Sequence, residues 1–249
     1  MRAANHIRKS TLALATCAMF AAVSPARATD GEILINQGKV NAGGITAGDA
    51  AGFPATLSKP GRYKLSGNLS VPANMNGIEV TADDVTINLN GFTITGEPTS
   101  GYGIVSMGGS SRLRIANGTV TGFNVAGLNP GPFSAVENMR LVSNNYGFSG
   151  VGPARITSST IVNNNLRGIE CNSGCSIEGN IVAGTANTGI YLPGGAGMVV
   201  GNVIAGNGGY GLSSAIAATG YGQNILVNNG AQVFGSSQLH PNVCDPACP

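Results

Sequence analysis

The sequence predicts an all-β protein: a single-stranded, right-handed parallel β-helix (a solenoid) of about 8 coils, each of 20–26 residues, capped at both ends. Two observations predict this fold. A glycine followed by a bulky apolar residue recurs seven times, and short apolar runs that end in Gly, Asn or Ser recur in step with it. Two registers that advance together by about 22 residues are typical of stacked repeats.

The glycine pairs form the first register. Successive glycines lie 26, 24, 20, 21, 21 and 22 residues apart. The apolar member of each pair is expected to point inward and to stack on its equivalent one coil away, at a spacing of about 4.8 Å. The pairs are Gly77-Ile78, Gly103-Ile104, Gly127-Leu128, Gly147-Phe148, Gly168-Ile169, Gly189-Ile190 and Gly211-Leu212.

The apolar runs predict a second inward column. Burial of one such side chain is worth roughly 1.5–3 kcal/mol, so the two columns would carry much of the stability. The predicted members are Ile94, Val120, Val142, Val162, Val182, Ile204 and Val227. Asparagines follow this column, and we interpret them as a hydrogen-bonded ladder at a repeated turn rather than a polar binding stripe. They are Asn144, Asn145, Asn163, Asn164, Asn165, Asn207, Asn228 and Asn229.

Other repeat architectures do not fit this period. A βαβ unit needs about 30 residues including a helix, and no helical pattern is present in the repeats. Leucine-rich repeats share the period but need a dense leucine frame, and propeller blades run to about 40 residues. A parallel solenoid remains.

Residues 1–28 have the pattern of a secretory signal peptide. A basic start precedes an apolar run over 11–23, and Ala26-Arg27-Ala28 predicts cleavage after Ala28. That run is shorter than the roughly 20 residues that span a membrane. A lipid anchor on Cys17 is the alternative, but Thr16 before it matches poorly. The sequence therefore predicts a secreted or periplasmic protein in which residues 29–249 form a single β-helix domain.

The charge balance excludes several partners. Four of the 13 basic residues lie in the predicted signal peptide, whereas all 11 acidic residues follow it. The remainder is slightly acidic and lacks a basic patch, which argues against a nucleic acid or an anionic membrane as partner. No membrane insertion is expected after cleavage. Charged residues make up 10% of the chain and glycines number 39, a composition that suits turns and short strands.

The two ends carry candidate caps. Residues 41–55 are rich in Gly and Ala and lack the repeat, which predicts an N-terminal cap. Residues 236–249 contain three prolines and two cysteines and predict a C-terminal cap. In an exported chain the four remaining cysteines favour disulfides. We predict the local pairs Cys171–Cys175 and Cys244–Cys248, because the coils that carry them should lie too far apart for cross-pairing. A four-cysteine zinc site is the alternative, with a loose spacing.

A family resemblance supports the fold. The segment Pro60-Gly61-Arg62-Tyr63, the run from Val85 to Ile94 and the Gly-Ile and Ile-Val coils resemble exported bacterial proteins of the right-handed parallel β-helix family. That family is the pectate-lyase-like superfamily of carbohydrate-active and carbohydrate-binding proteins. The resemblance spans residues 33–234 and implies a polysaccharide as partner and no cofactor. It does not imply an activity, because function depends on the site and not on the fold.

The catalytic devices that the resemblance implies are absent from the sequence. They are an acidic Ca²⁺ cluster beside a base, clustered Asp with a His and a basic motif, and an Asp-Pro-His-Asp block. After residue 28 the chain has one His, His240, and five Asp: Asp30, Asp49, Asp83, Asp84 and Asp245. We interpret Asp83-Asp84 as a polar turn, and no metal site is predicted. Glycoside hydrolysis needs two carboxylates roughly 5–10 Å apart, yet Glu170 has no acidic equivalent in an adjoining coil.

The best candidate site is the slot just before each glycine. It holds Tyr102, Tyr146, Arg167 and Tyr210, which predict a ligand-binding face, because Tyr and Arg suit sugar rings and uronate carboxylates. We expect Arg167 to rest on the ring of Tyr146 one coil away. If the protein is an enzyme, Arg140, Arg155, Arg167 and Glu170 are the catalytic candidates. The structural alternative is that the tyrosines cover a strand edge and that Arg167 and Glu170 form a surface ion pair.

Three functional hypotheses follow. The first is a non-catalytic exported β-helix, structural or in contact with polysaccharide through a lateral face. The second is a polysaccharide lyase, epimerase or hydrolase with a non-standard site. The third is a subunit that stacks or trimerises side by side. The sequence leaves open whether the protein is an enzyme, which polysaccharide it contacts and its oligomeric state.

Overall fold

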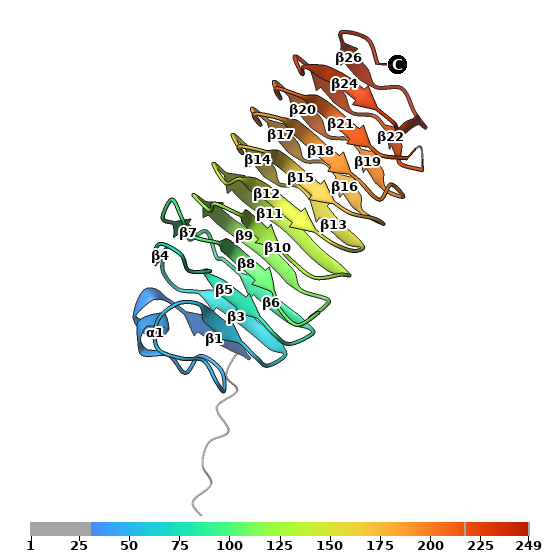
Figure 1. Cartoon of the computed structure of the whole chain (residues 1–249). Helices are drawn as coiled ribbons and strands as arrows, with labels where there is room; N and C mark the ends of the chain where they lie inside the picture. Colours follow the sequence, from blue (N-terminus) through green and yellow to red (C-terminus); the bar gives the residue numbers. More distant parts are fainter. Residues whose placement is uncertain (1–30, 217, 249) are drawn as a thin grey trace, which may run out of the picture. The chain divides into compact units, whose positions relative to one another are not determined.

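The computed structural model describes residues 31–216 and 218–248. From Gly31 on, the chain forms one compact unit in which every strand pairing is parallel and joins one coil to the next. Figure 1 shows these coils stacked along one axis. The predicted right-handed parallel β-helix is confirmed, in accord with the usual hand of parallel crossovers. The predicted signal peptide lies outside the described residues.

One side of the solenoid is a nine-stranded sheet, with one strand for each turn. The solenoid therefore has nine turns, compared with the predicted number of about 8, because the irregular first and last coils each contribute a strand to this sheet. The strands are β2 (Ala55–Leu57), β5 (Ile78–Val80), β8 (Tyr102–Ser106), β10 (Ala126–Asn129), β12 (Tyr146–Gly150), β15 (Arg167–Cys171), β18 (Thr188–Leu192), β21 (Tyr210–Ser214) and β24 (Ala231–Phe234).

The remaining strands belong to a 17-stranded sheet made of two adjoining strips. The long strands β9 (Arg114–Thr121) and β11 (Ser134–Val142) run through both strips. The first strip also contains β1 (Glu32–Ile35), β3 (Gly61–Leu65), β6 (Val85–Asn88), β13 (Ala154–Thr157), β16 (Ser176–Glu178), β19 (Met198–Val200), β22 (Gly220–Gly222) and β25 (Ser237–Gln238). The second contains β4 (Leu69–Val71), β7 (Thr93–Gly96), β14 (Thr160–Val162), β17 (Ile181–Ala183), β20 (Val203–Ala205), β23 (Ile225–Val227) and β26 (Val243–Asp245).

The first predicted column is confirmed at every position. Its seven side chains, from Ile78 to Leu212, are fully buried and pair in register from coil to coil. Ala55 and Val233 extend the column by one coil at each end. The structure adds a third column, along the first strip, which was not predicted. Its members are Tyr63, Ile87, Ile115, Val136, Ile156, Ile177, Val199 and Tyr221.

The second predicted column is wrong at three positions. Val142, Val162 and Val227 lie on the outer side of their strands, and the preceding residues fill the core in their place. The inward column is Ile94, Val120, Leu141, Ile161, Val182, Ile204 and Leu226, all fully buried. A strand that is apolar on both faces gives no period-two signal, so a shift of one residue could not be detected from sequence.

The glycine of each repeated pair is required by close stacking. A Cβ on Gly168 would lie 2.7 Å from the carbonyl oxygen of Gly189, and a Cβ on Gly189 would lie 2.8 Å from that of Gly211. Carbonyl groups of adjoining coils therefore approach the inner side of each strand at this point. None of these repeated glycines has a positive φ, so lack of a side chain, rather than left-handed backbone, explains the repeat.

The predicted asparagine ladder is confirmed for four of its members. The side-chain oxygens of Asn144, Asn164, Asn207 and Asn229 each accept a hydrogen bond from a backbone N–H of the preceding coil, at 3.0 Å. Thr185 occupies the equivalent position in the one intervening coil. The residues just before the ladder include Asn163 and Asn228, which adopt φ of 55°, a conformation that asparagine tolerates.

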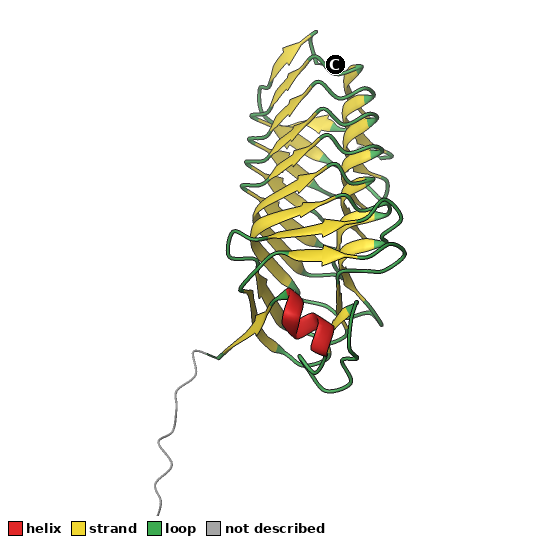
Figure 2. Ribbon diagram, turned by 90° about the vertical axis from the view of Figure 1, so that its left-hand side faces the viewer, coloured by secondary structure: helices red, strands yellow, loops and turns green. Residues whose placement is uncertain are grey.

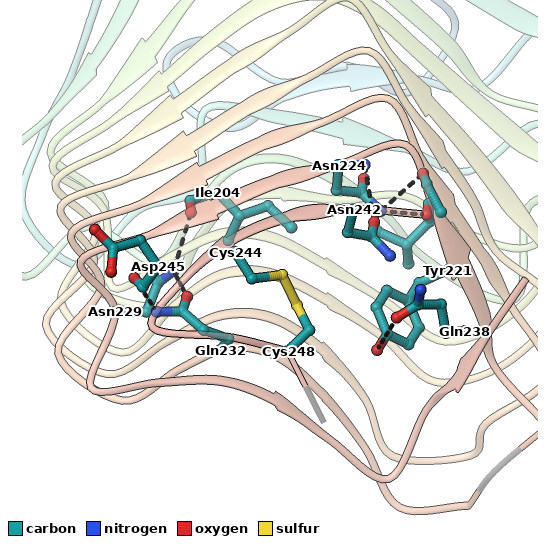
Figure 3. The surroundings of a disulfide bond; sticks show 12 residues. Ile204, Tyr221, Asn224, Asn229, Gln232, Gln238, Asn242, Cys244, Asp245 and Cys248 are labelled. Atoms are coloured by element: carbon teal, nitrogen blue, oxygen red, sulfur yellow. Dashed lines mark hydrogen bonds between the residues drawn. A yellow bond between two sulfur atoms is a disulfide. The ribbon is translucent and has the colours of Figure 1, made fainter. Parts of the chain in front are cut away.

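A second asparagine ladder, which was not predicted, runs along the bend between the two strips. The side-chain oxygens of Asn180, Asn202, Asn224 and Asn242 each accept from the backbone N–H one coil earlier, at 2.9 Å. Asn180, Asn202 and Asn224 are 1% exposed. Figure 3 shows the last step, from Asn224 to Asn242. The ladder satisfies backbone groups that the bend would otherwise leave unpaired in the interior.

The N-terminal end is closed by a short helix and a loop (Figure 2). Helix α1 (Gln37–Ala42) begins at Asn36, whose side chain accepts from the backbone N–H of Lys39 at 3.0 Å, and it buries Val40. The following loop is held by Asp49, whose carboxylate accepts from the backbone N–H groups of Ile45 and Thr56. Helix α1 overlaps the predicted cap segment, residues 41–55, and starts four residues before it.

The C-terminal tail continues the solenoid. Strands β25 and β26 pair with β22 and β23, so the described part of the predicted C-terminal cap, residues 236–248, adds a partial last coil. Both cysteine pairs are the local ones, with Cα–Cα distances of 6.4 Å for Cys171–Cys175 and 5.4 Å for Cys244–Cys248. The second pair lies across the open end of the core, as Figure 3 shows.

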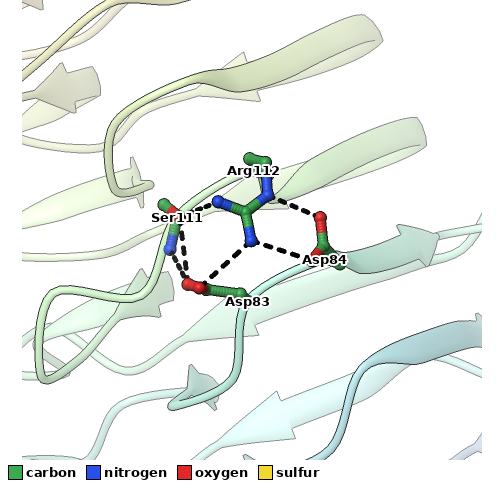
Figure 4. A network of polar contacts seen from close by, with 4 residues as sticks. All are labelled: Asp83, Asp84, Ser111 and Arg112. Atoms are coloured by element: carbon green, nitrogen blue, oxygen red, sulfur yellow. Dashed lines mark hydrogen bonds and ion pairs between the residues drawn. The ribbon is translucent and has the colours of Figure 1, made fainter.

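A charged cluster joins two early coils. Arg112 donates from Nε and one terminal nitrogen to the carboxylate of Asp84, at 2.6 and 2.8 Å, and also contacts Asp83 at 3.1 Å (Figure 4). Ser111 donates to Asp83 from its backbone N–H and its hydroxyl. These two aspartates lie in a bend before β6, as predicted. All their partners are internal, so the cluster is a structural contact between turns.

The cluster predicts an acid-sensitive stability. The pKa of Asp84 is lowered chiefly by its hydrogen bonds with Arg112, and that of Asp83 chiefly by the backbone N–H of Ser111. A lowered pKa stabilises the fold above about pH 4, and this contribution is lost as the pH falls through the native pKa. Arg112→Ala should therefore flatten the dependence of the unfolding free energy on pH below about pH 4, measured by urea titration at several pH values. Arg155→Ala, which removes another surface ion pair, should change it less.

Candidate functional site

The predicted slot before the glycines forms a continuous column on the outer side of the nine-stranded sheet. Tyr102, Ala126, Tyr146, Arg167 and Thr188 follow one another in register on five successive strands. Tyr210 and Ala231 continue the column on β21 and β24. The side chains of Tyr102, Tyr146 and Arg167 are half-buried, and Tyr210 is 37% exposed. Tyr146 and Arg167 lie side by side in register on neighbouring strands, one coil apart, as expected.

A second column lies beside it on the same surface. Ser149, Glu170, Tyr191, Ser213 and Phe234 are in register on the last five strands. We call the outer side of this sheet the aromatic face, defined by Tyr102, Tyr146, Arg167, Glu170, Tyr191, Tyr210 and Phe234. It carries four of the six tyrosines of the chain; the other two, Tyr63 and Tyr221, are buried in the core.

Arg167 lies at the centre of the aromatic face. It forms an ion pair with Glu170 on its own strand, and its guanidinium carbon lies 3.9 Å from the ring centroid of Tyr191 on the next strand. This ion pair is the one that the structural alternative expected. The expected ring was that of Tyr146, and this is wrong: the side chain reaches forward to β18, where its guanidinium is held both by the carboxylate and over a ring face.

The C-terminal part of the face holds an aromatic pair. The rings of Tyr210 and Phe234, one strand apart, have centroids 5.4 Å apart and planes tilted by 42°. Phe234 is 55% exposed. Sequence analysis missed Tyr191 and Phe234 as members of the face. Tyr191 stands two positions after its glycine, as Glu170 and Ser213 do, but in the sequence those positions were compared only for acidic partners of Glu170.

The structure does not bring the three catalytic arginine candidates together. Arg167 lies on the nine-stranded sheet, Arg155 on the first strip and Arg140 on the second strip. Arg155 forms an ion pair with Glu178 at 3.3 Å. In the described part of the chain, Arg140 has neither an ion-pair nor a hydrogen-bond partner. A single active site therefore cannot contain all three.

Two carboxylates occupy one column on the first strip, two coils apart. Glu137 and Glu178 are separated by Thr157, which corresponds to about 9.6 Å. Each is paired with an arginine, Arg114 and Arg155 respectively. The pKa of Glu178 is lowered, first by the hydroxyl of Ser176 and then by Arg155. A glycosidase general acid has a raised pKa, whereas that of Glu178 is lowered and both carboxylates are engaged by arginines.

Two adjoining cavities lie over the early coils of the two strips and share Asn117. They have volumes of about 340 and 510 Å³. Their floor is a polar ladder, in which Asn138 donates to Asn117 at 2.8 Å and Asn117 donates to Asn88 at 3.2 Å. Arg140 lines the smaller cavity and Arg62 the larger one. Neither cavity includes a residue of the aromatic face.

Among residues 31–216 and 218–248, no group of three or more His, Cys, Asp or Glu side chains is placed to hold a metal ion. Over the same residues, no helix has the length and apolarity needed to cross a bilayer.

Comparison with known proteins gives a fold relationship. No protein-family model and no curated protein matches the chain. Among solved structures, it is similar to the crystal structure of the Dettilon tailspike protein (gp208), with a TM-score of 0.55 and 16% sequence identity. The match covers 70% of this chain and 41% of the tailspike chain, so the chain corresponds to less than half of that protein. A likeness at this identity shows the parallel β-helix fold alone.

Proposed function

We propose that this is an exported, non-catalytic β-helix protein that contacts polysaccharide through the aromatic face. The observation that carries the proposal is the concentration of aromatic side chains on one sheet: all four tyrosines outside the core lie there. Aromatic rings stack on the apolar faces of sugar rings, and their hydroxyls remain available for hydrogen bonds. The likeness to a tailspike protein supports the parallel β-helix fold on which this face lies.

The spacing of the tyrosine rings along the aromatic face suits an extended polysaccharide chain. Tyr102 and Tyr146 are two strands apart, about 9.6 Å, and Tyr210 lies three strands beyond Tyr146, about 14 Å. These rings therefore recur along the solenoid axis, and a polymer that runs parallel to this axis meets them in succession. Arg167 lies between them. Its charge is balanced by Glu170, but only one of its terminal nitrogens donates to that carboxylate, so further guanidinium N–H groups suit a polymer with carboxylate groups.

The charged groups of the face argue for binding rather than turnover. Glu170 forms an ion pair with Arg167. The equivalent positions on the two neighbouring strands hold Ser149 and Tyr191, so no second carboxylate lies beside Glu170 in its column. Acid–base cleavage of a glycosidic bond uses two carboxyl groups with different protonation states. The proposal therefore assigns Arg167 and Glu170 to recognition.

Tyr146→Ala should weaken binding to a uronate polymer about tenfold, because it removes one stacking ring at the centre of the face. Tyr146→Phe keeps the ring and should retain most of the affinity. Binding is measured by affinity electrophoresis and calorimetry on a panel of uronate and neutral polymers, while reducing ends and unsaturated products are followed in the same samples.

Arg155→Ala is the matched control, because this arginine is exposed but lies on the other sheet. Its affinity should equal that of the unmodified protein. Equal loss in Tyr146→Ala and Arg155→Ala would contradict the assignment of the face. Polymer cleavage that disappears in Arg167→Ala would show instead that the protein is a lyase, epimerase or hydrolase.

A further inference from the structure

The outer side of the second strip is apolar over the C-terminal coils. Its first column holds Ile181, Val203, Ile225 and Val243, in register on β17, β20, β23 and β26. Its second column holds Val142, Val162, Ala183, Ala205 and Val227. We call these nine residues the aliphatic stripe. Ile181, Ile225 and Val243 are 46, 42 and 63% exposed.

The stripe is specific to these coils. On the early coils of the same strip, the equivalent positions hold Thr93, Thr95, Thr119 and Thr121. Strands β17, β20 and β23 are thus apolar on both sides, a pattern that is typical of strands covered on both faces. A contiguous apolar surface on an exposed sheet face is a candidate interaction site.

The ends of the stripe carry single charges of opposite sign. Arg140 precedes the first column on β11, and Asp245 ends the second column on β26. Among the described residues, neither side chain forms an ion pair or a hydrogen bond. An isologous interface pairs each position with its symmetry mate, so opposite charges at its two ends become complementary when two copies run in opposite directions.

We propose that the aliphatic stripe is a docking surface for a second copy of this chain, in an antiparallel arrangement about a twofold axis. With the axis between β17 and β20, Ile181 of each copy faces Val203 of the other, and Ala183 faces Ala205. Arg140 of each copy then lies opposite Val243 of the other. Asp245 is two residues further along that strand, about 6.6 Å, within reach of an arginine side chain.

The opposite orientation does not use these charges. If the two copies ran in the same direction, β11 would face β11 and β26 would face β26, so that Arg140 and Asp245 would stay at opposite ends of the interface. The antiparallel arrangement forms two Arg140–Asp245 pairs, one at each end. It also leaves the aromatic face free, because that face belongs to the other sheet.

The size of the stripe sets the expected affinity. Six strands of three residues give a footprint of about 25 by 10 Å, below what a permanent dimer buries. The dimer is therefore weak and reversible, and it forms as the protein concentration rises. Sedimentation equilibrium of the purified protein over a wide concentration range should show a monomer–dimer equilibrium.

Ile225→Lys tests the apolar contact. It places a charge in the middle of the stripe and should weaken dimerisation about tenfold or more. Thr95→Lys is the matched control, because this exposed residue lies on the same strip but on an early coil. It should leave the equilibrium unchanged. Both positions are on the surface, and circular dichroism verifies that each variant folds.

A charge exchange tests the orientation. Arg140→Asp and Asp245→Arg should each weaken dimerisation about tenfold, because each places like charges together, and the double variant should restore it. A protein that stays monomeric up to its solubility limit would overturn the proposal, as would a dimer that Ile225→Lys leaves intact. A trimer, or a double variant that is no better than the single ones, would overturn the twofold arrangement.

Discussion

Gly168→Ala is expected to destabilise the protein by about 3 kcal/mol, because the added methyl group would have no space. Its Cβ would lie 2.5 Å from Cγ1 of Val182 and 2.7 Å from the carbonyl oxygen of Gly189. The second contact is with backbone of the next coil, which cannot move without disturbing the hydrogen bonds of the sheet. Urea denaturation should show a lower midpoint with an unchanged m-value.

Gly179→Asn provides the control for this substitution. Gly179 has a φ of 64°, and no atom lies within 4 Å of the position its Cβ would take. Asparagine tolerates this conformation, and the chain itself places Asn163 and Asn228 in it. Although asparagine is larger than alanine, the loss should stay within about 1 kcal/mol. Equal losses in the two variants would contradict the stacking explanation for the repeated glycine.

Asn202→Leu is expected to cost about 3 kcal/mol, since it removes three side-chain-to-backbone hydrogen bonds and leaves the backbone N–H of Asn180 without its partner. The side-chain oxygen of Asn202 accepts from the backbone N–H of Asn180 at 2.9 Å. Its amide nitrogen donates to the carbonyl oxygens of Ile177 and Val200, at 2.9 and 3.1 Å. Leucine fills a similar volume but satisfies none of these groups. Urea denaturation measures the loss.

The exposed asparagine at the turn gives the comparison for the ladder. Asn228→Gly keeps the left-handed backbone at φ 55° and removes a solvent-exposed side chain, so the unfolding free energy should change by about 0.5 kcal/mol or less. A ladder that contributes nothing would make Asn202→Leu behave like Asn228→Gly. That result would show that the buried asparagines fill space and that their hydrogen bonds add no net stability.

The candidate site was predictable in part. The slot before the glycines gave Tyr102, Tyr146 and Tyr210, and the structure places them in one column as expected. The partner of Arg167 was not predictable, because the choice between the rings of Tyr146 and Tyr191 depends on which way a flexible side chain turns across the sheet. That choice is made by the neighbouring Glu170, which holds the guanidinium.

The sequence by itself determined the repeat, the parallel stacking, the column that starts at Ile78 and the two local cysteine pairs. These follow from spacing along the chain, which a constant rise per coil converts directly into neighbours in space. Only the tertiary structure decided which side of the second strip faces the core. Leu141 and Val142 are both apolar, so the two directions look alike in sequence. Pairing in register with Val120 and Ile161 on the adjoining coils places Leu141 in the core.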